Sequence, residues 1–323
     1  MTWQRRSETG MVWTAEQWPI GAALIQFPAR TREGIPVEDA GPAEWARVFG
    51  EVTACGFDHV DLTDTWLRPG DLTDGQREDL VRTLKDADLG VTAISVIRRS
   101  LLDPEHGKAN VDYALRTVEA AAAIGTGVVS LGLHRPLTAQ QLAAEWFWTQ
   151  PGAVDQQRDE ASFDLAVARF SRIGRHAASL GIQLSLEMYE DTLLGTAEDA
   201  VALVKAIDLP NVGLNPDIGN LIRLHRPIDD WEQMHLKTLP YANYWHVKNY
   251  YRDHDPATGA YFTVPAPAES GLISYRRAIE IALDAGFQGP ISVEHYGGDG
   301  LSVSARNRDY LRGVFRAKLG ARR

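Results

Sequence analysis

The sequence of 323 residues contains a single cysteine, Cys55. An intramolecular disulfide is therefore impossible, and a metal site made of several thiolates is excluded. No run of about 18 apolar residues occurs, so we expect no transmembrane helix and no membrane partner. The first 19 residues include basic side chains but no apolar segment of the signal-peptide type. These absences favour a cytoplasmic protein.

A basic excess is also missing. The chain has 33 Lys and Arg against 43 Asp and Glu, a formal net charge of −10. A nucleic-acid-binding protein normally carries a basic face, so we expect no nucleic-acid partner. The hydrophobic share of 44% and the charged share of 24% are those of an ordinary globular protein and exclude a disordered chain.

What the sequence does contain is a regular alternation of short apolar segments with longer amphipathic ones. The alternation predicts parallel strands joined by right-handed helical crossovers, and eight such units fit a (β/α)8 TIM barrel of the α/β class. A doubly wound sheet is the rival, but no G-x-G-x-x-G follows the first strand. The expected strands are 19–27, 56–62, 90–97, 126–134, 181–188, 211–217, 243–249 and 289–296. The expected helices lie near 43–54, 75–88, 108–124, 160–179, 197–207, 230–239, 273–285 and 302–318.

Glycines mark four of the expected helix ends: Gly56, Gly90, Gly181 and Gly286. Glycine there adopts the left-handed conformation that ends a helix.

We predict a single barrel domain over 19–323 after an N-terminal extension, 1–18. Two connections are too long to be simple loops: 27–43 after the first strand and an insertion at about 135–159 after the fourth. In a barrel both lie over the C-terminal face of the strands, where active sites are found.

Four apolar strands in the second half of the chain end in a charged or titratable residue. These residues are Glu187, Asp217, His246 and Glu294. A buried unpaired charge is costly, so each needs a partner. A single one of them is typical of a cap or an ion pair, but four in successive strands converge on one face of a barrel. Three carboxylates and one imidazole predict a site for Mn²⁺, Mg²⁺, Co²⁺ or Zn²⁺.

Other residues near the predicted strand ends are candidates for substrate contact: Asp61, Asn215 and Lys248. Alternation along the strand places Lys248 on the same side as His246. Asp61 is suited to bind a substrate hydroxyl or a neighbouring arginine, and Asn215 to orient a carboxylate or bind a hydroxyl. A solvated lysine is the alternative for Lys248.

His134 ends the fourth strand and precedes the long insertion, in which Trp146, Phe147 and Trp148 are consecutive. A histidine at the mouth can take or give a proton near neutral pH, although a structural histidine fits as well. The aromatic residues favour either a buried patch or the wall of a substrate pocket, with Trp146 and Trp148 as substrate contacts.

Four segments carry a family resemblance: LSLEMYED, PNVGLNPDIGN, YWHVKN and ISVEHY. They resemble the sugar phosphate isomerase/epimerase family of xylose-isomerase-like barrels, from residue 19 to the C-terminus. The resemblance implies that Glu187, Asp217, His246 and Glu294 hold a divalent metal, often manganese. It also implies that Glu187 and Glu294 shuttle a proton at a carbon next to a carbonyl.

Three positions depart from the family pattern. Asn220 stands where histidine is common, Asn249 where aspartate is common, and Asp61 where glutamate is usual. The LHRP segment with His134 and the long aromatic insertion resemble instead the catalytic α subunits of bacterial C-glycoside deglycosidases. That resemblance implies a 3-oxo-C-glycoside substrate and a small β subunit as partner.

These features predict a metal-dependent enzyme that forms the enolate of a keto sugar. The sequence favours a deglycosidase. Its base would be His134 or a glutamate ligand, and the enolate would expel the aglycone by breaking a C–C bond. As an isomerase or epimerase, it would return the proton on the other face. A non-catalytic sugar-binding barrel is a third hypothesis. An apurinic endonuclease would need more histidine ligands and a basic face.

Overall fold

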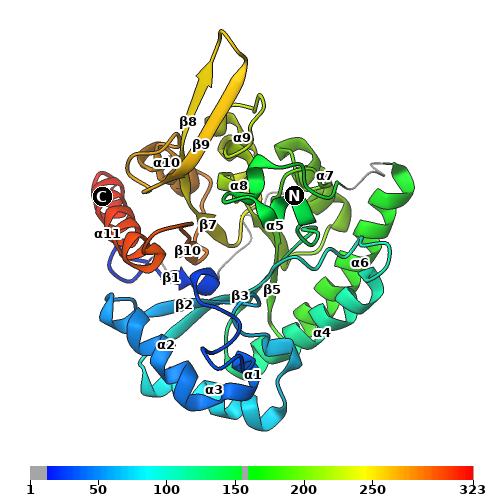
Figure 1. Cartoon of the computed structure of the whole chain (residues 1–323), viewed down its shortest axis with the longest axis vertical. Helices are drawn as coiled ribbons and strands as arrows, with labels where there is room; N and C mark the ends of the chain where they lie inside the picture. The colour runs from blue at the N-terminus through cyan, green and yellow to red at the C-terminus, as the bar shows by residue number, and fades with distance from the viewer. Residues whose placement is uncertain (1–12, 155–158, 323) are drawn as a thin grey trace.

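The computed structural model describes residues 13–154 and 159–322. Eight parallel strands form the wall of a barrel, and helices surround it (Figure 1). The strands, in chain order, are β1 Ile20–Ala23, β2 His59–Thr63, β3 Gly90–Val96, β4 Val128–Gly132, β5 Gln183–Glu187, β6 Val212–Asn215, β7 Trp245–Val247 and β10 Ile291–Val293. The predicted (β/α)8 fold is confirmed.

The strands lie side by side in the order β6-β5-β4-β3-β2-β1-β10-β7. A parallel bridge between Leu214 and Ala242 links the two ends of this sheet and nearly closes the barrel. Because all strands run the same way, their C-terminal ends open on one face. Side chains at those ends are brought together although they are far apart in the sequence.

Helices follow the strands as the apolar periodicity predicts, although the terminal bounds differ by a few residues at most. Polar residues cap several of them; Thr73 and Gln76, for example, form a capping box at the start of α3. The principal helices are α2 Pro42–Ala54, α3 Asp74–Asp86, α4 Gly107–Ile124, α6 Glu160–Ser179, α7 Ala197–Ile207, α9 Trp231–Thr238, α10 Tyr275–Asp284 and α11 Gly300–Gly320.

The glycine prediction holds at three of the four helix ends. Gly56, Gly181 and Gly286 have φ values of 78°, 72° and 77°. Gly90 is different, because Asp88 takes the left-handed conformation there with φ 54°. Gly90 instead begins β3, where the imidazole of His59 occupies the space that a Cβ would need.

The N-terminal residues of the described chain pack against the barrel. Trp18 is buried and stacks on Phe315 of α11 with ring centroids 4.3 Å apart. Residues 1–12 of the predicted extension, and 155–158 of the predicted insertion, lie outside the described residues.

An antiparallel hairpin after β7 was not predicted. It consists of β8, Asn249–Asp255, and β9, Ala260–Ala266, and it stands out from the barrel (Figure 1). The sequence signal was the DPATG segment between two strand-like runs, with Gly259 at φ 72°. The expected seventh strand, 243–249, therefore divides into the short barrel strand β7 and the start of this hairpin.

No helix in the described part of the chain is long and apolar enough to cross a membrane.

The core between α9 and β7 contains a histidine, His235, which is fully buried. Its Nδ1–H donates to the carbonyl of Trp231 at 2.8 Å, and its ring packs against Trp231 and Trp245. Burial lowers the pKa of His235 to about 4. The folded protein therefore keeps this ring neutral at pH values where the unfolded chain is protonated.

We expect this difference to make folding depend on pH. Between about pH 6.5 and pH 4 only the unfolded chain binds the proton, so stability is complete above this window and falls as the pH is lowered through it. Urea unfolding gives the free energy of unfolding at pH 7.5 and at pH 5.0. The decrease in this free energy between the two pH values should be larger in the wild type than in His235→Asn by about 1–2 kcal/mol. Equal losses in the two proteins would contradict the assignment.

Candidate metal centre

The four predicted metal ligands meet at the C-terminal mouth of the barrel. Glu187 ends β5, Asp217 follows β6 by two residues, His246 is the middle residue of β7, and Glu294 directly follows β10. Each of the four is at most 4% exposed. The parallel strand order explains why residues separated by more than 100 positions face one another.

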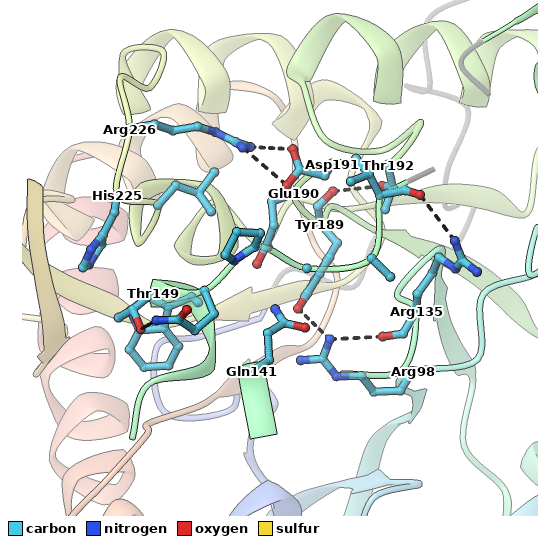
Figure 2. A pocket seen from close by; sticks show the side chains of 17 residues that line it. Arg98, Arg135, Gln141, Thr149, Tyr189, Glu190, Asp191, Thr192, His225 and Arg226 are labelled. Carbon is cyan, nitrogen blue, oxygen red and sulfur yellow. Dashed lines mark hydrogen bonds and ion pairs between the residues drawn. The ribbon is translucent and has the colours of Figure 1, made fainter. Parts of the chain in front are cut away.

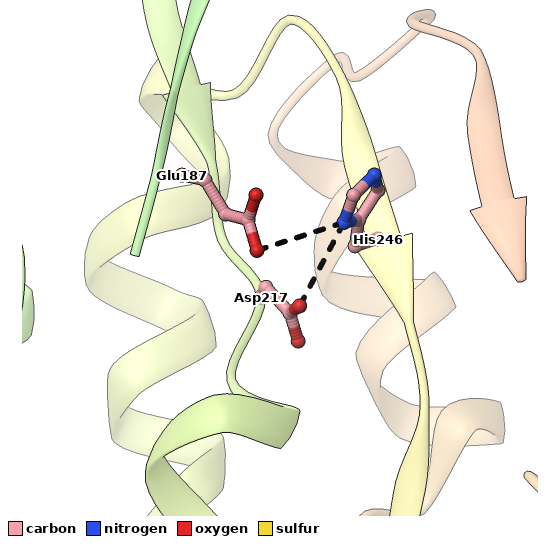
Figure 3. A group of neighbouring side chains, drawn as sticks. All are labelled: Glu187, Asp217 and His246. Carbon is pink, nitrogen blue, oxygen red and sulfur yellow. Dashed lines mark ion pairs between the residues drawn. The ribbon is translucent and has the colours of Figure 1, made fainter. Parts of the chain in front are cut away.

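The Nδ1 atom of His246 is the centre of this cluster. It lies 3.1 Å from Oε1 of Glu294 and 3.8 Å from both Oε1 of Glu187 and Oδ2 of Asp217. Figure 3 shows Glu187 and Asp217 pointing at the same edge of the imidazole. One ligand atom from each of Glu187, Asp217 and His246 falls within 4.8 Å of the others, as a metal site requires.

The far side of the imidazole is held by Asp61. Oδ2 of Asp61 lies 3.0 Å from Nε2 of His246 and accepts hydrogen bonds of 2.9 Å from Ser95 and Tyr244. The carboxylate at Nε2 holds the ring so that Nδ1 faces the other three carboxylates. Such a carboxylate–histidine pair is the usual arrangement behind a metal-binding histidine.

This arrangement gives Asp61 a structural role. Asp61 is fully buried beneath His246 and orients the imidazole, and its contact with substrate stays a prediction. Asn215 has a similar position: it is fully buried, its Oδ1 accepts from the backbone N–H of His246 at 2.7 Å, and its Nδ2 contacts Ser130. Asn215 thus supports the strand that carries His246, and its contact with substrate stays a prediction.

Lys248 balances the charge of the cluster. Its Nζ lies 2.6 Å from Oδ2 of Asp217 and 2.5 Å from Oε2 of Glu294, and the side chain is 3% exposed. The alternation argument thus placed it correctly, and the solvated alternative is excluded. Three carboxylates and one ammonium leave a formal charge of −2, which one divalent cation would neutralise. The positive charge of Lys248 and one divalent ion together would equal the negative charge of the three carboxylates.

The pKa values follow from these contacts. Burial alone would raise the pKa of Glu294, but Lys248 and His246 lower it to about 2. Burial would also raise the pKa of Glu187. Nearby His134 and His246 lower this pKa by more, so it lies well below the ordinary value of a glutamate. Both glutamates are therefore ionised at neutral pH and able to bind a cation or accept a proton.

Several buried atoms of the cluster have no hydrogen-bond partner among the described residues. They are Oε2 of Glu187, Oδ1 of Asp217 and Nδ1 of His246. Such groups are costly unless something else satisfies them. Two carboxylate oxygens and an imidazole nitrogen directed into one small space fit a divalent cation with mixed oxygen and nitrogen ligands.

Asn220 connects two of the carboxylates. Its Nδ2 donates to Oε1 of Glu187 at 3.2 Å, to Oδ2 of Asp217 at 3.1 Å and to the carbonyl of Met188 at 3.0 Å. From the sequence, Asn220 is expected either to orient a carboxylate, to bind a substrate hydroxyl or to cap a helix. The structure makes it the hydrogen-bond donor that keeps the two acids at a fixed separation.

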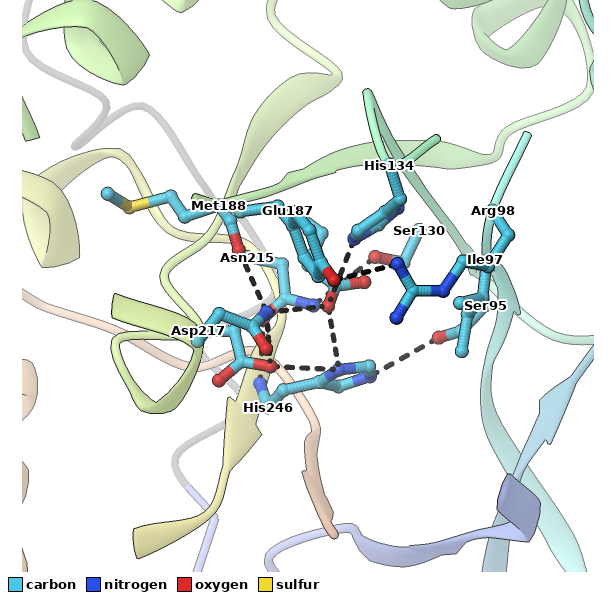
Figure 4. Close-up of polar contacts among 12 residues, drawn as sticks. Ser95, Ile97, Arg98, Ser130, His134, Glu187, Met188, Asn215, Asp217 and His246 are labelled. Carbon is cyan, nitrogen blue, oxygen red and sulfur yellow. Dashed lines mark hydrogen bonds and ion pairs between the residues drawn. The ribbon is translucent and has the colours of Figure 1, made fainter. Parts of the chain in front are cut away.

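His134 lies beside the cluster, as predicted. Its Nε2 is 3.4 Å from Oε1 of Glu187 (Figure 4). Its ring packs edge-on against Tyr189. Both ring nitrogens lack hydrogen-bond partners among the described residues. Gly132 allows this position, because a Cβ there would collide with the imidazole. The side chain is thus placed to exchange a proton with Glu187 or with a ligand of the cluster.

The aromatic insertion contributes to packing at the mouth. Trp148 is 4% exposed, stacks on Trp146 and meets Tyr250 and Tyr296 edge-on. Its Nε1–H donates to Thr263 of the hairpin at 3.1 Å. The structure therefore supports the predicted buried patch for most of the Trp148 surface, although one edge of Trp148 lines a pocket described below.

An ion pair that the sequence analysis missed lies behind this patch. Arg223 is fully buried, and its Nη2 lies 3.0 Å from both carboxylate oxygens of Glu190. The guanidinium also packs over the rings of Phe147, Trp148 and Tyr189. A charged residue in an apolar segment, LIRL, was the available signal.

Comparisons with known proteins agree with this fold. The model of the family described as xylose isomerase-like TIM barrel matches residues 49–314. No curated protein gives a match. A crystal structure of a xylose isomerase-like TIM barrel protein from Mycobacterium smegmatis, in complex with magnesium, is 44% identical with a TM-score of 0.91 and covers 95% of this chain and 100% of its own.

More distant solved structures share the fold alone. D-psicose 3-epimerase from Clostridium cellulolyticum H10, solved with D-tagatose, is 15% identical with a TM-score of 0.60, covering 94% of this chain and 97% of its own. The 3-keto-D-glucoside 4-epimerase from E. coli is 16% identical with a TM-score of 0.62, covering 92% and 99%.

Proposed function

The chain belongs to the xylose isomerase-like TIM-barrel family, and from that premise we propose that it is a divalent-metal-dependent sugar isomerase or epimerase. The observation that carries the proposal is the convergence of Glu187, Asp217 and His246 within 4.8 Å, with Glu294 at the same imidazole nitrogen. The similar protein from Mycobacterium smegmatis, solved with magnesium, supports a divalent ion. We propose Mn²⁺ as the ion, as the family resemblance implies.

The residues that would hold the ion are Glu187, Asp217, His246 and Glu294. When bound, a divalent cation polarises a carbonyl and the hydroxyl beside it, which lowers the pKa of the adjacent C–H. Lys248 keeps Asp217 and Glu294 ionised, and Asp61 keeps the imidazole of His246 oriented. The ion and Lys248 would together balance the charge of the three carboxylate ligands.

Glu187 and Glu294 are the proposed proton carriers. Both are ionised, and they approach the centre from β5 and β10, on different sides of the barrel mouth. One carboxylate would take the C–H proton of a keto sugar, leaving an enediolate. The other carboxylate, once it has itself been protonated, would return that proton to the opposite face, or to the neighbouring carbon in an isomerisation. His134, 3.4 Å from Glu187, would supply or receive that proton during turnover.

The deglycosidase reaction predicted first has less support. Its flat aromatic aglycone would need a wide apolar wall, but Trp148 is largely covered by Trp146, Tyr250 and Tyr296. The sugar enzymes among the similar structures named above are epimerases. The small β subunit belonged to the deglycosidase hypothesis and stays a prediction.

Hydrogen exchange tests the proposal directly. The purified protein would be loaded with Mg²⁺ or Mn²⁺ and incubated in D2O with a panel of ketoses, and the products analysed by NMR. We expect deuterium to enter at a carbon next to the carbonyl together with a new epimer or isomer. Chelation with EDTA should stop both. If no ketose exchanges with either ion, the proposed function is wrong; if a 3-oxo-C-glucoside instead releases its aglycone, the deglycosidase hypothesis replaces it.

A further inference from the structure

A pocket of about 430 Å³ lies next to the metal centre but does not include it. Four segments at the C-terminal mouth line it: the loop after β3, which carries Arg98, the insertion after β4, the loop after β5 and the segment after β6 and α8 (Figure 2). The volume is in the range of small-molecule sites, about 300–1,000 Å³. None of the proposed metal ligands lines it, so its occupant would be a part of the substrate distant from the reacting carbon.

Tyr189 is the wall shared by the pocket and the metal centre. One side of its ring meets His134 at a centroid distance of 4.4 Å, and His134 lies 3.4 Å from Glu187. Tyr189 also lines the pocket, and its hydroxyl accepts a 2.7 Å hydrogen bond from Nη1 of Arg98. Two side chains, Tyr189 and His134, therefore connect Arg98 with Glu187 of the metal centre.

Most charges around the pocket are already paired. Arg226 pairs with Asp191 at 2.7 Å, and the buried Arg223 pairs with Glu190. Arg135 lies 3.7 Å from a carboxylate oxygen of Asp103. These pairs neutralise every acid that lines the pocket.

Arg98 is the exception. Its guanidinium donates to two neutral acceptors, the hydroxyl of Tyr189 and the carbonyl of Arg135, and packs over the ring of Phe147. Within 13–154 and 159–322 it has no carboxylate partner. A partly buried guanidinium that is held in place yet lacks a counter-ion is suited to bind an oxyanion.

The backbone at this residue is also unusual. Arg98 has φ 62° and Asp191 has φ 60°, and both line the pocket. The other two described non-glycine residues with positive φ, Asp88 and Asp208, follow helices α3 and α7, where that conformation is ordinary. Left-handed backbone elsewhere costs about 1–3 kcal/mol and is concentrated at ligand sites.

We propose that this pocket is a second subsite, which binds an anionic group of the sugar substrate, a carboxylate or a phosphate, through Arg98. The proposal rests on the proposed function, because it assumes a sugar at the metal centre. It narrows the substrate class to acidic or phosphorylated keto sugars. Tyr189 acts as a positioning residue that holds Arg98 at the boundary between the two sites.

Calorimetric binding to the Mg²⁺-loaded protein tests the subsite. Three probes share one carbon skeleton: D-fructose, D-fructuronate and D-fructose 6-phosphate. We expect at least one anionic probe to bind about 10-fold or more tightly than D-fructose, with an advantage that shrinks as salt is added. Arg98→Gln should remove that advantage and leave the affinity for D-fructose unchanged. Arg47→Gln, on the exposed face of α2, is the control for net charge and should behave as the wild type.

The two anionic probes separate a carboxylate site from a phosphate site. Three results would overturn the subsite. They are equal binding of all three probes by the wild type, absence of anion binding, and an anion preference that is kept in Arg98→Gln. Deuterium exchange, measured separately with neutral ketoses, reports on the proposed function. Deuterium exchange without a preference for anionic probes would support the proposed function and refute the subsite. Arg98-dependent binding of an anionic probe without exchange on any probe would support the subsite and refute the proposed function.

Discussion

Glu294→Gln is expected to lower the rate of proton exchange in ketose substrates by about 10³-fold or more, equivalent to about 4 kcal/mol of transition-state stabilisation. The carboxylate is 2% exposed, and Lys248 and His246 keep its pKa at about 2. Glutamine fills the same volume but cannot take up a proton. It also leaves Nζ of Lys248 with one charged partner fewer. Exchange rates by NMR in D2O, with a thermal melt to verify the fold, measure the effect.

Two comparisons make that result specific to proton transfer. His134→Ala should slow exchange as well, because its Nε2 lies 3.4 Å from Glu187, but it should keep the wild-type metal affinity. Glu187→Gln should abolish epimerisation to the same extent as Glu294→Gln. In Glu187→Gln the substrate proton should still exchange into D2O, because Glu294, the base that removes it, is retained. Turnover of Glu294→Gln within 10-fold of the wild type would refute its role.

Asp217→Asn is expected to weaken divalent-metal binding by about 100-fold or more, near 2.7 kcal/mol. Asp217 is fully buried, and one of its oxygens lacks any hydrogen-bond partner among the described residues. The substitution keeps the shape and removes the charge, so the cluster would hold two carboxylates against Lys248 and the cation. Calorimetric titration with Mg²⁺, Mn²⁺ and Zn²⁺ gives the affinities, and excess metal should restore part of the activity.

The matched control for that variant is Asp64→Asn. Asp64 is also a buried aspartate on the strand-end face, but it contacts Arg99 and the backbone N–H of Ile97 rather than the cluster. Burial raises the pKa of Asp64 to about 6, so neutralising it costs little near that pH. We expect its metal affinity to equal that of the wild type. A matching loss in both variants would indicate a general change of the mouth rather than loss of a ligand.

The local sequence pattern of apolar and polar residues was sufficient to predict most of the fold. The bounds of α6 and α7 agree with those predicted, because each has a clear apolar periodicity and a polar cap: Asp159 for α6 and Thr196 for α7. The hairpin β8–β9 was missed because its outer face is exposed and carries Tyr251, Phe262 and Val264, so it has no buried apolar run of the barrel type.

The candidate site was predictable as a set of residue types at strand ends, but their individual roles were not. Asp61 and Asn215 have the chemistry of substrate contacts, yet both are fully buried beside His246. Lys248 could be assigned to the mouth by alternation, but only the coordinates place its ammonium between two carboxylates. The unpaired state of Arg98 likewise depends on which acids the other arginines meet.

The sequence by itself determined the barrel, the order of its strands, and the set of acids and histidines at their C-terminal ends. It did so because strand and helix formation depends on residues a few positions apart, and parallel strands bring their ends to one face. Only the tertiary structure decided the charge balance of the centre, the orientation that Asp61 gives to His246 and the pocket beside Tyr189. Those properties depend on contacts of about 3 Å between residues that are distant in the chain, for which local pattern contains no information.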